Sequence, residues 1–173
     1  LVCSSLNRNS GTMVREKTKM EKMLISGVAA DKNVAKIRVA GLGNDPESTF
    51  RLLNLLDRNN LNIDVMIQSL GKDGTKSVSF TVAKPDMLRT IDVLNDNKDS
   101  LGIKKLDYDE NVAKISVIGA GVRSHSGVAA KMFGALANTE MITTSEIRIT
   151  ALIDEAYADQ AMRAIHETFL ERV

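Results

Sequence analysis

The sequence is poor in the features that mark several functional classes. Cys3 is the only cysteine, which excludes an internal disulfide framework and a cysteine-rich metal site and is typical of a reducing, cytoplasmic location. Aromatic residues make up only 3% of the chain, and 23 Lys and Arg are balanced by 22 Asp and Glu. No apolar run approaches the roughly 18 residues of a membrane span. We therefore expect neither a nucleic-acid partner nor a membrane partner.

An internal repeat organises what is present. The pentapeptide NVAKI occurs at residues 33–37 and again at 111–115, and a glycine-containing apolar run follows each copy. After the first copy, Ile37 and Val39 alternate with Lys36 and Arg38, which is the period of a half-buried strand. A helix is predicted next, with Asn44 or Asp45 as N-cap, Pro46 at the first helical position, and a stripe of Thr49, Leu52, Leu53 and Leu56.

The rest of the first copy completes a βαββαβ unit. Two β-rich runs, 61–70 and 76–82, flank a cluster of turn residues at 71–74 and predict a hairpin. Pro85 opens a second helix, and a short strand follows at 104–109. The inward face of this helix is predicted to carry Met87, Leu88, Ile91 and Leu94.

The second copy repeats this order but stops early. It has a strand at 113–121, a helix at 127–137, strands at 141–146 and 147–153, and a last helix. The inward residues are predicted to be Ala129, Met132, Phe133 and Leu136 in the first helix, and Ala158, Ala161, Met162, Ile165 and Phe169 in the last. The missing closing strand would leave a sheet edge unpaired.

An α+β fold of two ferredoxin-like βαββαβ units is therefore predicted. We expect the β-like run 23–30 to supply the closing strand of the second unit, so that the first unit is inserted in the second. The predicted segments are an N-terminal strand at 21–32, a first unit at 33–110 and a second unit at 111–173. Only Asn138, Thr139 and Glu140 separate helix from strand in the second unit, so this loop is either trimmed or incomplete.

The strand-to-helix loops are the best candidates for a binding site. Both loops, GLGNDPEST and GAGVRSHSGVA, present backbone N–H groups at a helix N-terminus, where a carboxylate is favoured. The adjacent strand starts are expected to adjoin these turns and carry polar residues suited to an ammonium group or hydroxyl: Asn62, Asp64 and Gln68 in one unit, and Thr143, Thr144, Ser145 and Glu146 in the other. Together they fit a free amino acid, although ordinary caps and turns would look the same. His125 and His166 have no metal-ligand neighbours in the sequence, and no metal site is expected.

Several motifs together resemble the regulatory region of aspartokinase, with its tandem ACT domains. They are GVAADKNVAKIRVAG, LNIDVMIQ, DGTKSVSFTV, NVAKISVIGAGVRSHSGVAAKMF, ITTSEIRIT and RAIHETF. The combination of RSH-x-GVAA with TSEIRI is highly specific, and the resemblance runs from about Ile25 to the C-terminus. Residues 1–20 are similar to the tail of the family's kinase domain and the linker that follows it.

The resemblance implies feedback control. In this family a kinase domain phosphorylates the β-carboxylate of aspartate with ATP, the first step toward lysine, threonine and methionine, and threonine, lysine or both bind the ACT domains to inhibit it. It implies a homodimer, an amino-acid effector between ACT units, and a partner kinase domain or subunit. The chain itself is expected to hold no catalytic residue and no cofactor, with ATP and magnesium belonging to the kinase domain. The effector-binding residues implied by the motifs are Asn44, Asp45, Pro46, Glu47, Ser48, Thr49, Asn62, Ile63, Asp64, Gln68, Ser124, His125, Ser126, Gly127, Val128, Ala129, Thr143, Thr144, Ser145 and Glu146.

The sequence departs from the family's pattern in two loops. The first usually reads Asp-Lys-Pro-Gly, where this chain has residues 44–47 as Asn-Asp-Pro-Glu. An acidic group near the ligand's ammonium is what would distinguish lysine from threonine, so the choice of effector stays open. Ser126 replaces the usual proline of the second loop, which loosens the loop without removing its donors.

Two other functions use the same kind of unit. An RNA-binding module would need exposed strand aromatics and a basic surface. A small acylphosphatase-like enzyme would use Arg123 to hold a phosphate and would need an asparagine placed to activate water.

Overall fold

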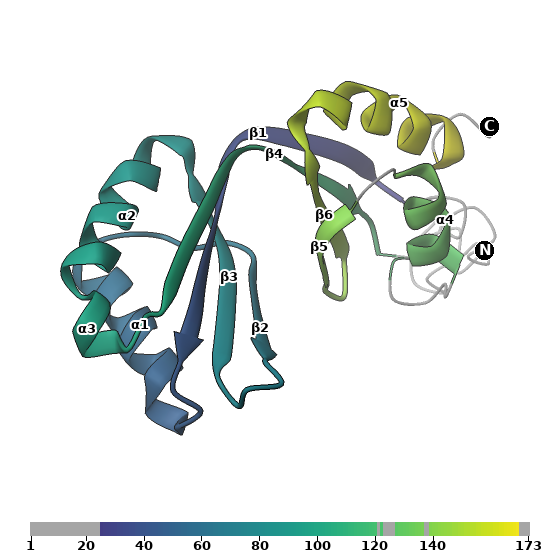
Figure 1. The fold of residues 1–173 in the computed structure, drawn as a ribbon. Helices are drawn as coiled ribbons and strands as arrows, with labels where there is room; N and C mark the ends of the chain where they lie inside the picture. Colours follow the sequence, from purple (N-terminus) through teal and green to yellow (C-terminus); the bar gives the residue numbers. More distant parts are fainter. Residues whose placement is uncertain (1–24, 121, 123–126, 137–138, 170–173) are drawn as a thin grey trace, which may run out of the picture.

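The computed structural model describes residues 25–120, 122, 127–136 and 139–169. These residues form a six-stranded antiparallel sheet in the order β2-β3-β1-β4-β6-β5. Helices α1, α2 and α3 cover the outer face of one half of the sheet, and α4 and α5 cover the outer face of the other (Figure 1). No helix in the described part of the chain has the length and apolar character needed to cross a membrane.

The elements follow the order predicted from the sequence, except that the short helix α3 was not predicted. The strands are β1 Gly27–Leu42, β2 Met66–Leu70, β3 Lys76–Ala83, β4 Lys105–Ile118, β5 Thr139–Thr144 and β6 Arg148–Asp154. The helices are α1 Pro46–Arg58, α2 Met87–Asp96, α3 Lys98–Leu101, α4 Gly127–Ala135 and α5 Ala158–Phe169, and the 3-10 turns η2 Lys84–Asp86 and η3 Glu155–Tyr157 precede α2 and α5. The predicted hairpin is present, and Gly74 adopts the left-handed conformation in its turn (φ 75°).

Two long strands, β1 and β4, run through both halves of the sheet. Residues 34–40 of β1 pair with β3, whereas residues 27–31 pair only with 114–118 of β4. The amide of Ser26 extends this pairing by donating to the carbonyl of Ile118 (2.7 Å). The predicted pairing of the N-terminal run with the second unit is therefore present, while residues 23 and 24 lie outside the described part.

The strands expected to be separate are continuous. The unit boundaries predicted at 32/33 and 110/111 fall inside β1 and β4, so the two halves share one sheet. Register shifts in the β1–β4 ladder lie between Asp31 and Lys36, where both strands bend from one half into the other (Figure 1).

Each half has its own core between sheet and helices, and the predicted helix faces are partly right. In α1 the buried residues are Ser48, Leu52 and Leu56, whereas Thr49 and Leu53 are only half-buried. Leu52 and Leu56 are thus buried as predicted, and Ser48 takes the place predicted for Thr49. Ser48 can be buried because its hydroxyl donates to the carbonyl of Gly43 (2.6 Å).

Two large apolar residues predicted to face inward are exposed. Leu88 in α2 is 67% exposed, and Phe133 in α4 is 44% exposed. Thr90 takes the buried place in α2, because its hydroxyl donates to the carbonyl of Asp86 one turn earlier (2.7 Å). The face predicted for α5 is confirmed: Ala158, Ala161 and Ile165 are buried and Met162 and Phe169 pack beside them.

A third apolar cluster lies on the other face of the sheet and is referred to as the inner-face cluster. It consists of Val34, Val65, Val112, Met141 and Leu152, all at most 6% exposed, with Ile67 packed against them. Its members come from both halves of the sheet, so it holds the two halves together.

The short connection in the second half is accommodated by the helix before it. Helix α4 has 9 residues, whereas its counterpart α1 has 13, a difference of about one turn. The amide of Leu136 still bonds to the carbonyl of Met132 (3.1 Å), and β5 begins at Thr139 with an irregular register. Helix α4 therefore ends about one turn earlier than its counterpart, and residues 137 and 138 of the connection lie outside the described part of the chain.

Candidate functional site

The turn between β1 and α1 contains the first group of predicted effector residues. Asp45 is the N-cap and Pro46 the first helical residue, as predicted. The Asp45 side chain does not cap the helix, and its carboxylate lies 3.6 Å from Arg51 instead. The first-turn N–H groups of α1 are therefore not taken by this side chain.

Gln68 completes this turn from the neighbouring strand. The hydroxyl of Thr49 donates to the side-chain oxygen of Gln68 (2.7 Å). Lys76 donates to the carbonyl of Asp45 (2.7 Å) and fixes the loop from β3. Asn44 and Glu47 are exposed beside them. The structure thus brings residues 44–49 and Gln68 together, as the sequence predicted.

The segment Asn62–Asp64 lies at the other end of β2. Strand β1 ends at Leu42, level with Lys76 of β3 and Leu70 of β2, whereas the amide of Asp64 bonds to the carbonyl of Thr81 (3.1 Å), near the middle of the sheet. The expectation that this segment adjoins the first turn of its own unit is therefore wrong. Because β1 and β2 run in the same direction, the start of β2 is near the start of the unit's β1 segment.

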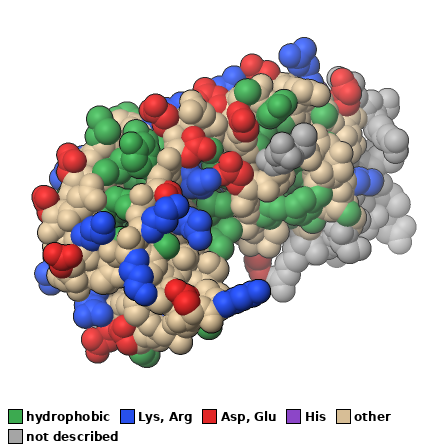
Figure 2. All heavy atoms as spheres, in the orientation of Figure 1, with side chains coloured by type: hydrophobic (Ala, Val, Ile, Leu, Met, Phe, Trp, Pro, Cys, Tyr) green, Lys and Arg blue, Asp and Glu red, His purple; other side chains and the backbone are tan. Residues whose placement is uncertain are grey.

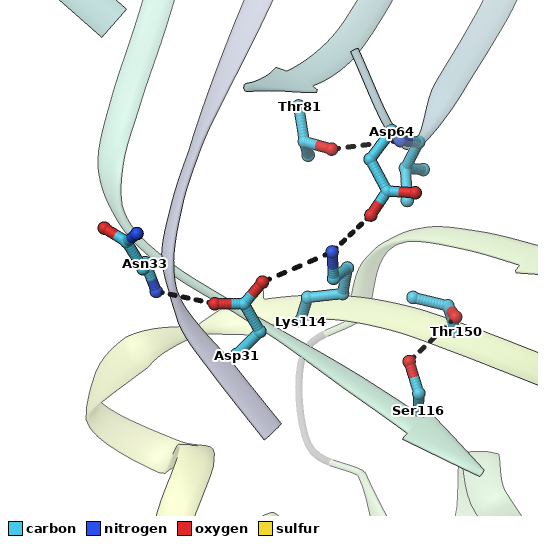
Figure 3. A network of polar contacts seen from close by, with 8 residues as sticks. Asp31, Asn33, Asp64, Thr81, Lys114, Ser116 and Thr150 are labelled. Atoms are coloured by element: carbon cyan, nitrogen blue, oxygen red, sulfur yellow. Dashed lines mark hydrogen bonds and ion pairs between the residues drawn. The ribbon is translucent and has the colours of Figure 1, made fainter. Parts of the chain in front are cut away.

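A polar pocket of about 300 Å³ surrounds Asn62–Asp64. Asp31, Asn33, Asp86 and Lys114 line it together with residues 81–83. Lys114 forms an ion pair with Asp64 and lies 3.4 Å from a carboxylate oxygen of Asp31 (Figure 3).

Backbone and hydroxyl groups hold this pocket in shape. The amide of Asn33 donates to Asp31 (2.9 Å), and the amide of Val65 donates to the hydroxyl of Thr81 (3.0 Å) (Figure 3). Thr81 is 1% exposed, so its hydroxyl is a buried part of the wall. The pocket wall is partly acidic, and Lys114 lies between the carboxylates of Asp31 and Asp64.

The second strand-to-helix turn is described only in part. Residues Ser124, His125 and Ser126 lie outside the described part of the chain, as does Arg123. The amide of Gly119 donates to the carbonyl of Ile147 (2.8 Å), which brings the end of β4 to the β5–β6 hairpin that carries Thr143, Thr144, Ser145 and Glu146. At the start of α4, Val128 is 6% exposed and Ala129 packs against the core, so these two side chains support the turn rather than face solvent.

Sequence reasoning did not include Lys36, Lys114 or Asp31 among the site residues. Lys36 forms an ion pair with Glu140, and Lys114 forms one with Asp64. The available signal was the repeat itself, because both lysines are the fourth residue of NVAKI.

The described residues do not favour the RNA-binding alternative, and Arg123, which the acylphosphatase-like alternative needs, lies outside them. Of the two aromatic residues on described strands, Phe80 is buried and only Tyr108 is exposed. Acidic and basic side chains are interspersed over the face shown in Figure 2. Within residues 25–120, 122, 127–136 and 139–169, no group of three or more His, Cys, Asp or Glu side chains is placed to hold a metal ion.

Comparison with known proteins places this arrangement in a family. The family model of the ACT domain matches residues 115–169. The aspartokinase of Pseudomonas aeruginosa is 35% identical over 175 residues, a match that covers 97% of this chain and 42% of the relative. The aspartokinase of Helicobacter pylori (strain 26695) is 39% identical over 176 residues, covering 96% of the chain and 43% of the relative.

Two solved structures match this chain over nearly the whole of their own length. A crystal structure of aspartokinase alpha and beta subunits matches with a TM-score of 0.79 and 41% identity, covering 84% of this chain and 98% of that one. The regulatory subunit of aspartate kinase from Thermus thermophilus, in its ligand-free form, matches with a TM-score of 0.79 and 32% identity, covering 84% and 99%. The chain belongs to the aspartokinase family.

Within this family, the chain corresponds to the regulatory part. It spans about 42% of the length of the curated relatives it matches, and almost all of the regulatory subunit from T. thermophilus. The predicted α+β fold with ferredoxin-like ACT units is confirmed. The assignment of individual residues to an effector site stays a prediction.

Proposed function

We propose that this chain is the regulatory region through which an amino acid, threonine or lysine or both, inhibits an aspartokinase. The observation that carries the proposal is the β1–α1 turn, where Thr49 and Gln68 are joined at an uncapped helix N-terminus in a chain of this family. The kinase domain, ATP and magnesium belong to the partner part of the enzyme, and the chain alone is expected to be catalytically inactive.

The chemistry of the turn suits a zwitterion. The first-turn N–H groups and the positive end of α1 favour the ligand's carboxylate. The side-chain oxygen of Gln68 accepts from Thr49, and we propose that its NH2 group donates to the same carboxylate. Asn44 and Glu47 are exposed at the turn and supply acceptors for the ammonium.

A second chain is needed to enclose the ligand. Because Asn62–Asp64 lies far from the turn of its own unit, its predicted role in effector contact requires a homodimer that brings it to the turn of the partner. An effector that bridges two chains then stabilises one dimer arrangement and biases the kinase domain, provided that it binds the two arrangements with different affinity.

Isothermal titration calorimetry with threonine and lysine, each added separately to the full chain, tests the proposal. At least one should release or absorb heat and raise the melting temperature. Gln68→Ala should weaken binding about tenfold because one hydrogen bond to a charged group is lost. Ser69→Ala, at the next position of β2, is the matched control and should bind normally.

The result that would contradict the proposal is clear. If neither amino acid gives heat or a thermal shift, the chain does not sense them. Binding that survives Gln68→Ala unchanged would move the site away from this turn.

A further inference from the structure

The two NVAKI copies meet at the centre of the molecule. The first lies in β1 and the second in β4, and these strands pair with each other in antiparallel orientation. Val34 of the first copy pairs directly with Val112 of the second. The ladder is symmetric about this pair, since Lys36 lies opposite Asp109 just as Lys114 lies opposite Asp31. The repeat therefore surrounds an approximate internal two-fold axis.

The repeated lysine reaches across this axis in both copies. Lys36, in the first half, forms an ion pair with Glu140 at the start of β5, in the second half. Lys114, in the second half, forms an ion pair with Asp64 just before β2, in the first half. The two acids are equivalent as well, because they end the matching triplets NID at 62–64 and NTE at 138–140.

These ion pairs are partly shielded from water. The Lys36 and Lys114 side chains are 23% and 16% exposed, whereas their partners Glu140 and Asp64 are 34% and 55% exposed, and the neighbouring inner-face cluster is apolar. Val65 and Met141, the residues that follow the two acids, belong to this cluster. A charge pair beside a dry apolar surface is screened less by solvent than one on an open surface.

A further contact spans the halves at the ends of β3 and β6. Lys84 of η2 lies 2.7 Å from Glu155 of η3, and both side chains are about one-third exposed. The two turns are equivalent in the repeat, because each directly follows the third strand of its unit. Among the residues that the structure describes, the halves are thus joined by three ion pairs arranged around one axis.

We propose that Lys36 and Lys114 form a reciprocal clasp, in which the repeated lysine of each unit anchors the other unit's chain where its second strand begins, at Glu140 near the start of β5 and at Asp64 just before β2. Displacement of the chain at either acid then acts directly on a strand of the opposite unit, so the two units respond together. The use of this clasp in regulation rests on the proposed function, because residues 62–64 are among the predicted effector contacts. The clasp itself does not, so its test is made without any amino acid.

Hydrogen–deuterium exchange of the full chain tests the crossed pattern. Lys114→Met should speed exchange roughly two- to tenfold in the peptide that contains Asp64 and Val65, in the first unit. Lys36→Met should do the same for the peptide that contains Glu140 and Met141, in the second unit. Lys105→Met removes an exposed lysine of β4 whose partner, Asp107, is in the same strand, and it should change neither peptide.

The carboxylate side of the clasp gives an independent measurement. Glu140→Gln should reproduce the exchange change of Lys36→Met, and the double variant should be no faster than either single variant. Exchange that increases only around the mutated strand, or changes that simply add in the double variant, would overturn the clasp. A failure of amino acids to bind in calorimetry would leave this result untouched, so the two proposals fail separately.

Discussion

Single hydroxyl groups decide where polar residues can be buried in this fold. Ser48, Thr81 and Thr90 are each at most 1% exposed. Ser48 and Thr90 donate to backbone carbonyls, and Thr81 accepts from the amide of Val65. Because each hydroxyl is hydrogen-bonded, its burial costs little, whereas the loss of one partner would leave a buried polar group unsatisfied.

Thr81→Val is the sharpest test at this scale. The substitution keeps the shape of the side chain but leaves the buried amide of Val65 without its acceptor. We expect the free energy of unfolding to fall by about 1–3 kcal/mol. Chemical denaturation measures the change, and Ser79→Ala, two positions earlier in β3, should stay within about 0.5 kcal/mol of the wild type. Equal stability of the two variants would show that the hydroxyl is not needed there.

At the scale of elements, the 3-10 turn before α2 sets which face of that helix is buried. The turn Lys84–Asp86 delivers Met87, Thr90 and Leu94 to the sheet. Leu88 is left 67% exposed although it lies on the same apolar sequence pattern. The conformation of the turn that leads into a helix therefore decides which of its faces is buried, even where the sequence pattern indicates another face.

Two leucines of α2 provide a matched pair. Leu94 is fully buried, so Leu94→Ala should lower the free energy of unfolding by about 2–5 kcal/mol through lost burial and a cavity. Leu88→Ala should change it by less than about 0.5 kcal/mol. Both values come from urea denaturation followed by circular dichroism. A large loss for Leu88→Ala would mean that a partner covers this residue in solution.

At the scale of the whole molecule, the two ACT units are structurally one body. Strands β1 and β4 pass through both, and the inner-face cluster draws residues from both. Neither unit can unfold without breaking the central ladder that it shares with the other. This continuity is also what allows a local event in one unit to reach the other.

We therefore expect a single cooperative unfolding transition. Leu56→Ala lies in the core of the first unit and Ile165→Ala in that of the second, and each should lower the one transition temperature without splitting it. Differential scanning calorimetry measures this, with the calorimetric enthalpy equal to the van't Hoff enthalpy. Two separated transitions in either variant would show that the units unfold independently.

One part of the candidate site, the contact between the β1–α1 turn and Gln68, could be predicted from the sequence. Residues 44–49 adjoin Gln68 because a strand, its helix and the next parallel strand bring those ends together in any βαβ arrangement. The position of Asn62–Asp64 was mistaken because a polar segment near a strand in sequence was assumed to lie at the same end. Because β2 runs parallel to β1, its C-terminal end lies near the β1–α1 turn, and Asn62–Asp64, before its N-terminal end, lies at the opposite end.

The sequence by itself determined the order of the main strands and helices, the turn residues and the existence of two similar units. These depend on the local backbone period and on hydrogen bonds within a few residues, which any short stretch reveals. The tertiary structure alone decided that separate strands join into β1 and β4, which helix faces turn inward, and which acids the repeated lysines meet. Lys36 and Glu140 are 104 positions apart and Lys114 and Asp64 are 50 apart. Such contacts arise because the shared sheet brings residues of the two units together, and a local sequence pattern holds no information about these long-range contacts.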